Sequence, residues 1–442
     1  MYRKKTTPTQ DDPQEDEDKP EWEYVPRDSK KMEGKNHEDY SFTIPFLHGN
    51  VDHVVVITSK QEQCNNNING ASFISTCFNG LNALSGVGIV SLPYAMASGG
   101  WLSLILLLVI ASSAFYTGLL IQRCMDTDPT ITSYTDIGDR AFGKTGKVIV
   151  SITMNLEVYL AATGFLILEG DNLSNLFPNM KLEVYGYHIS STCGFILLVS
   201  LIILPTCWLR NMNILSYVSA SGVLASMIIL GSAFWAGAVD DIGFQEKGEL
   251  LNWNGLPSAI SLYAFCYSAH PVLFLCFALC TVTYSLMAVI GYLMFGSNAA
   301  SQITLNLPTN KMSSRVAIYT TLVTPIAKYA LFLTPIVNDI EARFQHSYNK
   351  RTCSFLTRTP LMISTVFVAL YLPFFGSLMS LVGALLSATT SITIPCACYL
   401  KISGIYKRIG VEMVIVGFVL LSGVIVAVFG TYVSFVDIIS HL

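Results

Sequence analysis

The sequence predicts an all-α membrane protein that crosses the bilayer many times. Hydrophobic residues make up 52% of the chain and charged residues only 13%, whereas a soluble domain carries roughly 25% charged residues. Residues 1–71 hold the acidic run DDPQEDED and few apolar residues. Such a composition cannot bury a core, so it predicts a disordered, acidic cytosolic tail. Residues 72–440 form the predicted transmembrane domain, whose partner is the lipid bilayer, and we expect no nucleic-acid partner.

Apolar segments follow the tail at regular intervals. About 20 apolar residues cross the hydrocarbon core of a bilayer, and most of these segments reach that length. The predicted spans are 73–98, 101–123, 147–168, 190–208, 213–238, 256–270, 272–295, 316–337, 359–375, 377–400 and 412–436.

Basic residues between the spans predict the orientation, because cytosolic loops carry the excess of Lys and Arg. With the N-terminus in the cytosol, twelve basic residues fall in cytosolic loops: Arg123, Arg140, Lys144, Lys147, Arg210, Arg343, Lys350, Arg351, Arg358, Lys401, Lys407 and Arg408. Four fall on the far side: Lys181, Lys247, Lys311 and Arg315. We therefore expect a cytosolic N-terminus.

The stretch 256–295 has no charged side chain, and only His270-Pro271 interrupts it. As one helix it would be ~60 Å long, about twice the ~30 Å hydrocarbon core. A single crossing would also move every later loop to the other side and remove the charge bias. Two crossings are therefore predicted, although 256–270 is then only ~22 Å long.

The first span is interrupted where a membrane helix should be continuous. Gly86 and Gly88 lie in its middle and Pro93 follows. Lipid cannot satisfy a broken backbone, so such breaks occur against protein or a wet cavity, and transporters use them to hold small polar solutes. The competing explanation is that Gly and Pro are common in membrane helices.

Two ionisable residues lie near the middle of predicted spans, Glu157 and Lys328. A charge at a helix centre costs ~2.5–3.5 kcal/mol on insertion scales, so such residues face the protein interior. We expect them to lie near each other. They are either a fixed ion pair between two helices or coupling residues, with Glu157 exchanging a proton or Lys328 supplying a fixed charge where a sodium ion would sit.

His270 shares the second break with Ser268 and Pro271. Substrate contact is plausible there, while a hydrogen-bonded structural role is the alternative. The eleven cysteines show no spacing typical of a metal site or a disulfide framework. No motif of a membrane enzyme and no filter-like repeat of a channel is present. We expect no enzymatic activity, no metal and no cofactor, with a proton gradient as the driving force.

Several motifs together resemble the amino acid/auxin permease family, in particular its vacuolar amino acid transporter branch, which is similar to the vesicular inhibitory amino acid transporters. They are GLNALSGVGIVSLPYA (80–95), SYTDIGDRAFG (133–143), LEGDNL (168–173), SLYAFCYSAHPV (261–272), GYLMFG (291–296) and IAKYALFLTPI (326–336). The resemblance covers roughly residues 72–440.

The resemblance implies an inverted-repeat fold of five plus five spans and one more, with spans 1 and 6 unwound at the midplane. The implied substrate site is an amino-acid site formed by Ser85, Gly86, Val87, Gly88 and Ile89 with Ser268, His270 and Pro271. Free N–H groups at a helix start suit a carboxylate. The implied function is secondary active transport of amino acids across a vacuolar membrane, and which amino acid and which direction remain open, as does the oligomeric state.

The chain departs from the family after Pro271, where the second half of span 6 and a basic loop are missing. This favours an alternative function, an amino-acid sensor or an inactive isoform with the transporter fold. Sodium coupling is a further alternative, against which the positive charge of Lys328 argues.

Overall fold

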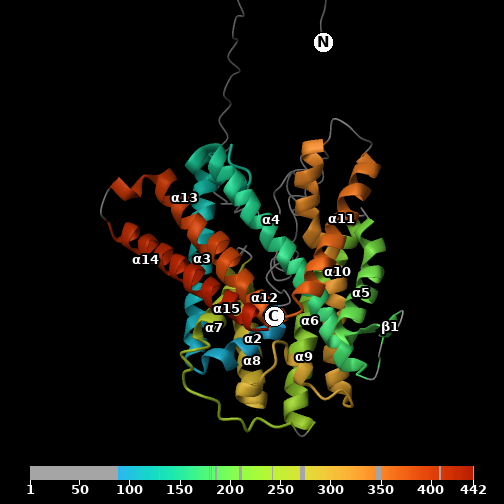
Figure 1. Ribbon diagram of the computed structural model, residues 1–442. Coiled ribbons are helices and arrows are strands. Elements are labelled where there is room, and N and C mark those ends of the chain that lie inside the picture. Colours follow the sequence, from blue (N-terminus) through green and yellow to red (C-terminus); the bar gives the residue numbers. More distant parts are fainter. Residues whose placement is uncertain are drawn as a thin grey trace, which may run out of the picture. The chain divides into compact units, whose positions relative to one another are not determined.

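The computed structural model describes residues 88–441, apart from 129, 179, 181, 185–186, 209–211, 241, 269–273, 345–349 and 408–409. Almost all of the described chain is helical (Figure 1). The strands of the described residues are β1 (Leu182–Val184) and β2 (Tyr187–Ile189), a small antiparallel hairpin between α4 and α5. The prediction of an all-α membrane protein is confirmed.

The helices fall into two successive sets. The first set is α2 (Gly88–Gly99), α3 (Ser103–Thr127), α4 (Tyr134–Leu176), α5 (Ser191–Trp208) and α6 (Met212–Val239). The second set is α7 (Leu256–Cys266), α8 (Phe274–Phe295), α10 (Met312–Phe344), α11 (Lys350–Tyr371) and the composite helix α12 (Phe375–Leu381), η5 (Val382–Ser387), η6 (Thr389–Thr393) and α13 (Ile394–Ser403). Short connectors are η4 (Gly296–Asn298), α9 (Ile303–Asn306) and η7 (Ile405–Lys407), and α14 (Val411–Ile425), η8 (Val426–Gly430) and α15 (Thr431–His441) end the chain.

The two sets are inverted copies in their general plan. Each begins with a short helix, α2 of 12 residues and α7 of 11 residues, and these two helices pack against each other. They are antiparallel, because Gly88 lies against Cys266 at one end and Gly255 lies against Ser98 at the other. The long third helices of the two sets, α4 and α10, also pack together. The fold is the predicted inverted-repeat transporter fold.

Each predicted span overlaps a helix or a composite helix of the described chain, while residues 73–87, 269–270 and 272–273 of these spans lie outside the described part. Eight helices of the described chain are long and apolar enough to cross a membrane. One predicted boundary is wrong: the break between the ninth and tenth spans lies at residues 372–374, not near 376. Pro373 explains the shift, because proline disfavours helical backbone at the residue before it.

The loops alternate between two ends of the bundle, the upper and lower ends in Figure 1. At the end that we call the cap end, Arg123 pairs with Glu412 at 2.8 Å and Lys147 with Asp136 at 3.2 Å. At the other end, the hairpin end, Trp101 Nε1 donates to the Lys247 carbonyl at 2.9 Å. Predicted cytosolic loops thus meet at the cap end and predicted far-side loops at the hairpin end.

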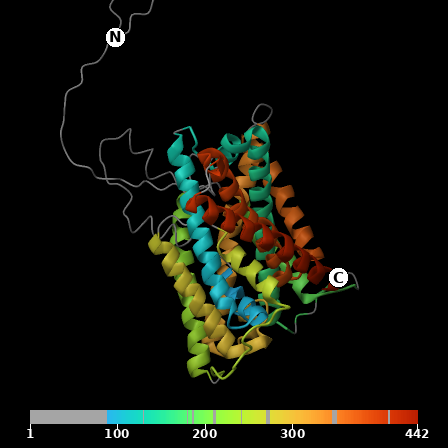
Figure 2. The ribbon, with the colours of Figure 1, turned by 90° about the vertical axis from the view of Figure 1, so that its left-hand side faces the viewer.

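The stretch 256–295 starts and finishes at the same end of the bundle, in agreement with the two predicted crossings. Gly255, at the start of α7, packs on Ser98 at the hairpin end. The last turn of α8 returns to that end, where the Glu246 N–H donates to the Leu293 carbonyl at 3.1 Å. Figure 2 shows α8 beside α3 and α6, on which it packs. At ~1.5 Å per residue α7 is only about 16 Å long, shorter than the predicted segment.

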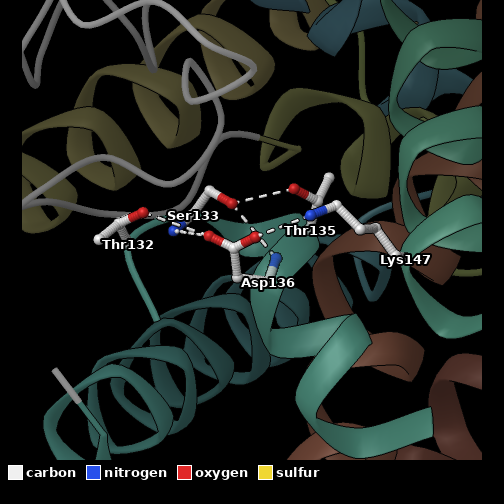
Figure 3. Close-up of polar contacts among 5 residues, drawn as sticks. All are labelled: Thr132, Ser133, Thr135, Asp136 and Lys147. Atoms are coloured by element: carbon white, nitrogen blue, oxygen red, sulfur yellow. Dashed lines mark hydrogen bonds and ion pairs between the residues drawn. The ribbon is translucent and has the colours of Figure 1, made fainter. Parts of the chain in front are cut away.

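The start of α4 is fixed by a capping box (Figure 3). Ser133 Oγ accepts from the Asp136 N–H at 3.2 Å, and Asp136 Oδ2 accepts from the Ser133 N–H at 3.1 Å. This arrangement satisfies two backbone donors that a helix start leaves unpaired. Non-helical backbone at Gly143 then splits α4 into a short cap helix and the long membrane helix. The motif at 133–143 therefore forms the cap at this end of the bundle.

Candidate functional site

The two short helices pack side by side in the interior of the bundle, with Gly88 of α2 against the end of α7. A methyl group on Gly88, the first residue of α2, would come 2.6 Å from Cys266 Sγ, and Cys266 is the last residue of α7. Gly88 and Ile89 are buried, and Ile89 is 2% exposed. A helix start carries a partial positive charge and a helix end a partial negative charge. With the predicted break before Gly88, opposite ends of two helix dipoles would lie side by side, an arrangement that suits a zwitterion.

Five predicted site residues cannot be placed. Ser85, Gly86 and Val87 precede α2, and His270 and Pro271 follow α7, so all five lie outside the described residues. The structure describes α2 from Gly88 onward and shows that α7 ends at Cys266. Gly88 and Cys266 lie against each other, and the roles of the five residues stay predictions.

Ser268 lies just beyond the end of α7 and is tied to the composite helix. Its carbonyl oxygen accepts a hydrogen bond from Ser391 Oγ at 3.0 Å, and its N–H donates to the Phe265 carbonyl at 3.3 Å. Ser391 is in turn held by α3, since Thr117 Oγ1 donates to the Ser391 carbonyl at 2.6 Å. The second break is thus anchored through its backbone to η6.

Glu157 is buried on α4, 2% exposed, and faces the same composite helix. Ser387 Oγ donates to Glu157 Oε1 at 2.5 Å, and Thr390 Oγ1 donates to Glu157 Oε2 at 2.8 Å. Tyr134, from the cap helix, donates to the Thr390 carbonyl at 2.7 Å. Each carboxyl oxygen of Glu157 therefore accepts a hydrogen bond. The two donors lie in the π-helical segments η5 and η6. Such π-helical turns are often found at functional sites.

Glu157 and Lys328, which were predicted to lie near each other, do not form an ion pair with each other. The ion pairs among the described residues join Arg123 to Glu412, Arg140 to Asp128 and Lys147 to Asp136. Lys328 is 3% exposed on α10. Asn155 of α4 faces α10, where its Nδ2 donates to Asp339 Oδ2 at 2.7 Å. Glu157 is two positions further on, about 200° around the helix, so it points away from α10.

The hydroxyl residues of the composite helix were not among the predicted site residues. Ser387, Thr390 and Ser391 link Glu157 of α4 to Ser268 of the second break. The signal in the sequence is the run SATTSIT inside an apolar span. In a membrane span, side chains of this kind form hydrogen bonds between helices.

Comparison with known proteins defines the class to which this fold and site belong. Residues 69–436 match the family model described as transmembrane amino acid transporter protein. The chain is 54% identical over 401 residues to amino acid transporter AVT1I of Arabidopsis thaliana, covering 87% of this chain and 99% of that protein. It is 55% identical over 386 residues to AVT1J of the same plant, covering 83% of this chain and 91% of that protein.

Solved structures give a more distant likeness. One is MhsT in complex with L-phenylalanine, with a TM-score of 0.45 and 11% identity over 81% of this chain and 99% of that chain. Another is a mutant of the Eremococcus coleocola manganese transporter, with a TM-score of 0.48 and 12% identity over 84% of this chain and 88% of that chain.

The class is therefore that of membrane amino acid transporters, not enzymes. The chain belongs to the transmembrane amino acid transporter family, as the motifs at 80–95, 168–173 and 261–272 predict.

Proposed function

We propose that this chain carries amino acids by proton-coupled secondary transport across a vacuolar-type membrane, with its N-terminus in the cytosol. The observation that carries the proposal is the contact between Gly88 and Cys266, which sets the first described turn of α2, directly after the predicted first break, beside the end of α7. The helix start offers N–H donors to a carboxylate, and the helix end offers carbonyl groups to an ammonium group. These two groups are common to all α-amino acids.

Transport also needs the site to respond to the driving ion. Glu157 is the predicted proton-exchanging residue, and its hydrogen bonds to Ser387 and Thr390 connect it through the neighbouring Ser391 to Ser268. Loss or gain of a proton at Glu157 would change the hydrogen bonds of both hydroxyls, and the change would reach the second break. Lys328 is the proposed fixed positive charge in the place of a sodium ion.

The membrane and the orientation rest on charge and resemblance. The cap end holds the predicted cytosolic charges, including Arg123, Arg140 and Lys147, and basic residues favour the cytosolic side. The named relatives are amino acid transporters of a plant.

The test is uptake of a labelled amino-acid mixture into proteoliposomes that contain the purified full chain, with and without a pH gradient. We expect uptake that depends on the gradient and is lost when an ionophore dissipates it. A gradient of sodium at equal pH is the matched control for the driving ion. No uptake by folded protein, with recovery after the missing half of span 6 and its loop are inserted, would instead identify a sensor or an inactive isoform.

A further inference from the structure

A second acidic residue of α4 is buried like Glu157 and differs from it in its partners. Glu169 of α4 is 0% exposed. Neither of its carboxyl oxygens has a hydrogen-bond partner among the described residues, whereas both oxygens of Glu157 have one. An ionised carboxylate buried without partners costs far more than a neutral one, so a group in this position holds a proton instead. Glu169 is therefore a candidate for a group that binds a proton.

The register between α4 and α10 places one charged group opposite Glu169. Ser151 Oγ and Asn155 Nδ2 both donate to Asp339, and the rings of Phe165 and Phe332 lie 4.8 Å apart. The two helices are therefore antiparallel. Glu169 follows Phe165 by four residues on α4, and Lys328 precedes Phe332 by four residues on α10. Each is therefore one helical turn from its ring, on the same face of its helix. From this register we infer that a buried carboxyl and a buried amine lie at about the same level of one interface.

The other elements around Glu169 bring few ionisable groups to this level. On α5, which packs on α4 at Gly170, the group is Cys193. Neither α9 (Ile303–Asn306) nor α12 (Phe375–Leu381) contains an ionisable residue. On α11, Arg358 is held elsewhere, because its Nη1 donates to the Cys207 carbonyl at 2.7 Å. Lys328 is therefore the cationic group best placed to balance a negative charge on Glu169.

A chain of polar side chains leads from Glu169 toward the hairpin end. Asn172, one turn further along α4, donates through Nδ2 to Gln302 Oε1 at 2.5 Å. Gln302 Nε2 in turn donates to Asp171 Oδ2 at 3.1 Å, and Asp171 is partly exposed. The Asn172 Oδ1 atom, like the Glu169 oxygens, is buried without a hydrogen-bond partner among the described residues. Polar groups thus line the way between Glu169 and the surface.

We propose that Glu169 is a proton-binding residue of the transport cycle, which takes up its proton from the hairpin end, and that Lys328 offsets its charge after release. The proposal rests on the proposed function, because it adds a proton site to the same transporter. In the release step the O–H bond of the carboxyl breaks, its electron pair stays on the carboxylate, and the proton passes to water on the open side. Glu169 can then approach Lys328, since opposite charges attract strongly in a low-dielectric interface.

The test compares the full-length wild type with Glu169→Gln in proteoliposomes, using the labelled amino-acid mixture. Glutamine has the shape of the protonated carboxyl but cannot release a proton. We expect Glu169→Gln to exchange labelled for unlabelled amino acid at equal pH on both sides, at a rate close to wild type. We expect its net uptake to gain nothing from a pH gradient. Glu249→Gln, at an exposed position on the 240–255 loop, is the matched control and should keep the full response to the gradient.

The outcomes separate the two proposals. A wild type whose uptake ignores the pH gradient would contradict the proposed function. A wild type that responds, together with a Glu169→Gln variant that responds equally, would overturn only the assignment of Glu169. If Glu169→Gln does not fold, Lys328→Met provides the second test. Without the balancing charge Glu169 should hold its proton more tightly, so the pH that supports half-maximal uptake should rise; an unchanged pH profile would overturn the proposal.

Discussion

Gly88 of α2 lies against Cys266 of α7 so closely that a methyl group at Gly88 would come within 2.6 Å of Cys266 Sγ and 3.3 Å of its Cα atom. The contact joins residues that are far apart in the sequence and lie at the edges of the two predicted breaks. It brings the start of one helix to the end of another, and it leaves no room for a larger residue at the position of Gly88.

The first prediction concerns this contact. Gly88→Ala should force α2 and α7 apart at the site, with an overpacking cost of about 1–3 kcal/mol, and should strongly reduce uptake. Adding Cys266→Ala removes the sulfur atom and should restore part of the uptake. Gly231→Ala on α6 is the control, because nothing lies within 4 Å of a methyl group there. Uptake by Gly88→Ala at the wild-type level would show that the close contact does not matter for transport.

The second prediction concerns the proton role of Glu157. Glu157→Gln keeps the size of the side chain but cannot exchange a proton, so uptake should no longer depend on the pH gradient. The measurement is the initial rate of uptake with and without the gradient, normalised to folded protein in the vesicles. If the variant keeps a wild-type response to the gradient, Glu157 does not exchange the coupling proton, and its hydrogen bonds to Ser387 and Thr390 are structural.

The third prediction tests whether the hydroxyl group of Thr390, and not the size of its side chain, stabilises the protein. Thr390→Val removes the donor to Glu157 Oε2 (2.8 Å) and leaves a buried carboxyl oxygen unpaired, at a cost of about 1–3 kcal/mol. Thr390→Ser keeps the hydroxyl and should retain most of the stability. Thermal unfolding in detergent is the measurement. Equal melting temperatures for the valine and serine variants would mean that this hydrogen bond contributes little.

The fourth prediction concerns the cap of α4, far from the site. Ser133→Ala removes the acceptor for the Asp136 N–H and should destabilise the protein by about 1 kcal/mol, as is typical for loss of a helix N-cap. Thr132→Ala is the control, since Thr132 contributes only a side-chain contact to Asp136 at 3.2 Å near the surface. Denaturation of the two variants, measured side by side, should show the larger loss for Ser133→Ala.

Much of the helical framework could be predicted because it depends on local sequence. Hydropathy located the membrane helices, and the charge counts predicted both the alternation of the loops and the return of α8 to the hairpin end, which the Glu246–Leu293 hydrogen bond confirms. The break before Pro373 was misplaced by a few residues, because apolar residues continue across it and only the backbone restriction of proline marks the helix end.

The direction in which buried polar side chains point could not be predicted in this way. Glu157 and Lys328 are both buried, as expected for charges inside spans, yet Glu157 binds Ser387 and Thr390 on the composite helix. Which helix lies on which face of α4 depends on packing between segments more than 200 residues apart, and hydropathy carries no information about it.

The sequence by itself therefore determined the class of protein, the places of its helices and the family to which it belongs, because membrane insertion and helix formation follow from the composition of each segment. The tertiary structure alone decided that Gly88 meets Cys266, that Glu157 is paired with hydroxyls, and that Glu169 is buried with no hydrogen-bond partner among the described residues. These relationships arise where helices distant in the sequence pack, and the rotation of each helix about its axis is fixed only by its neighbours.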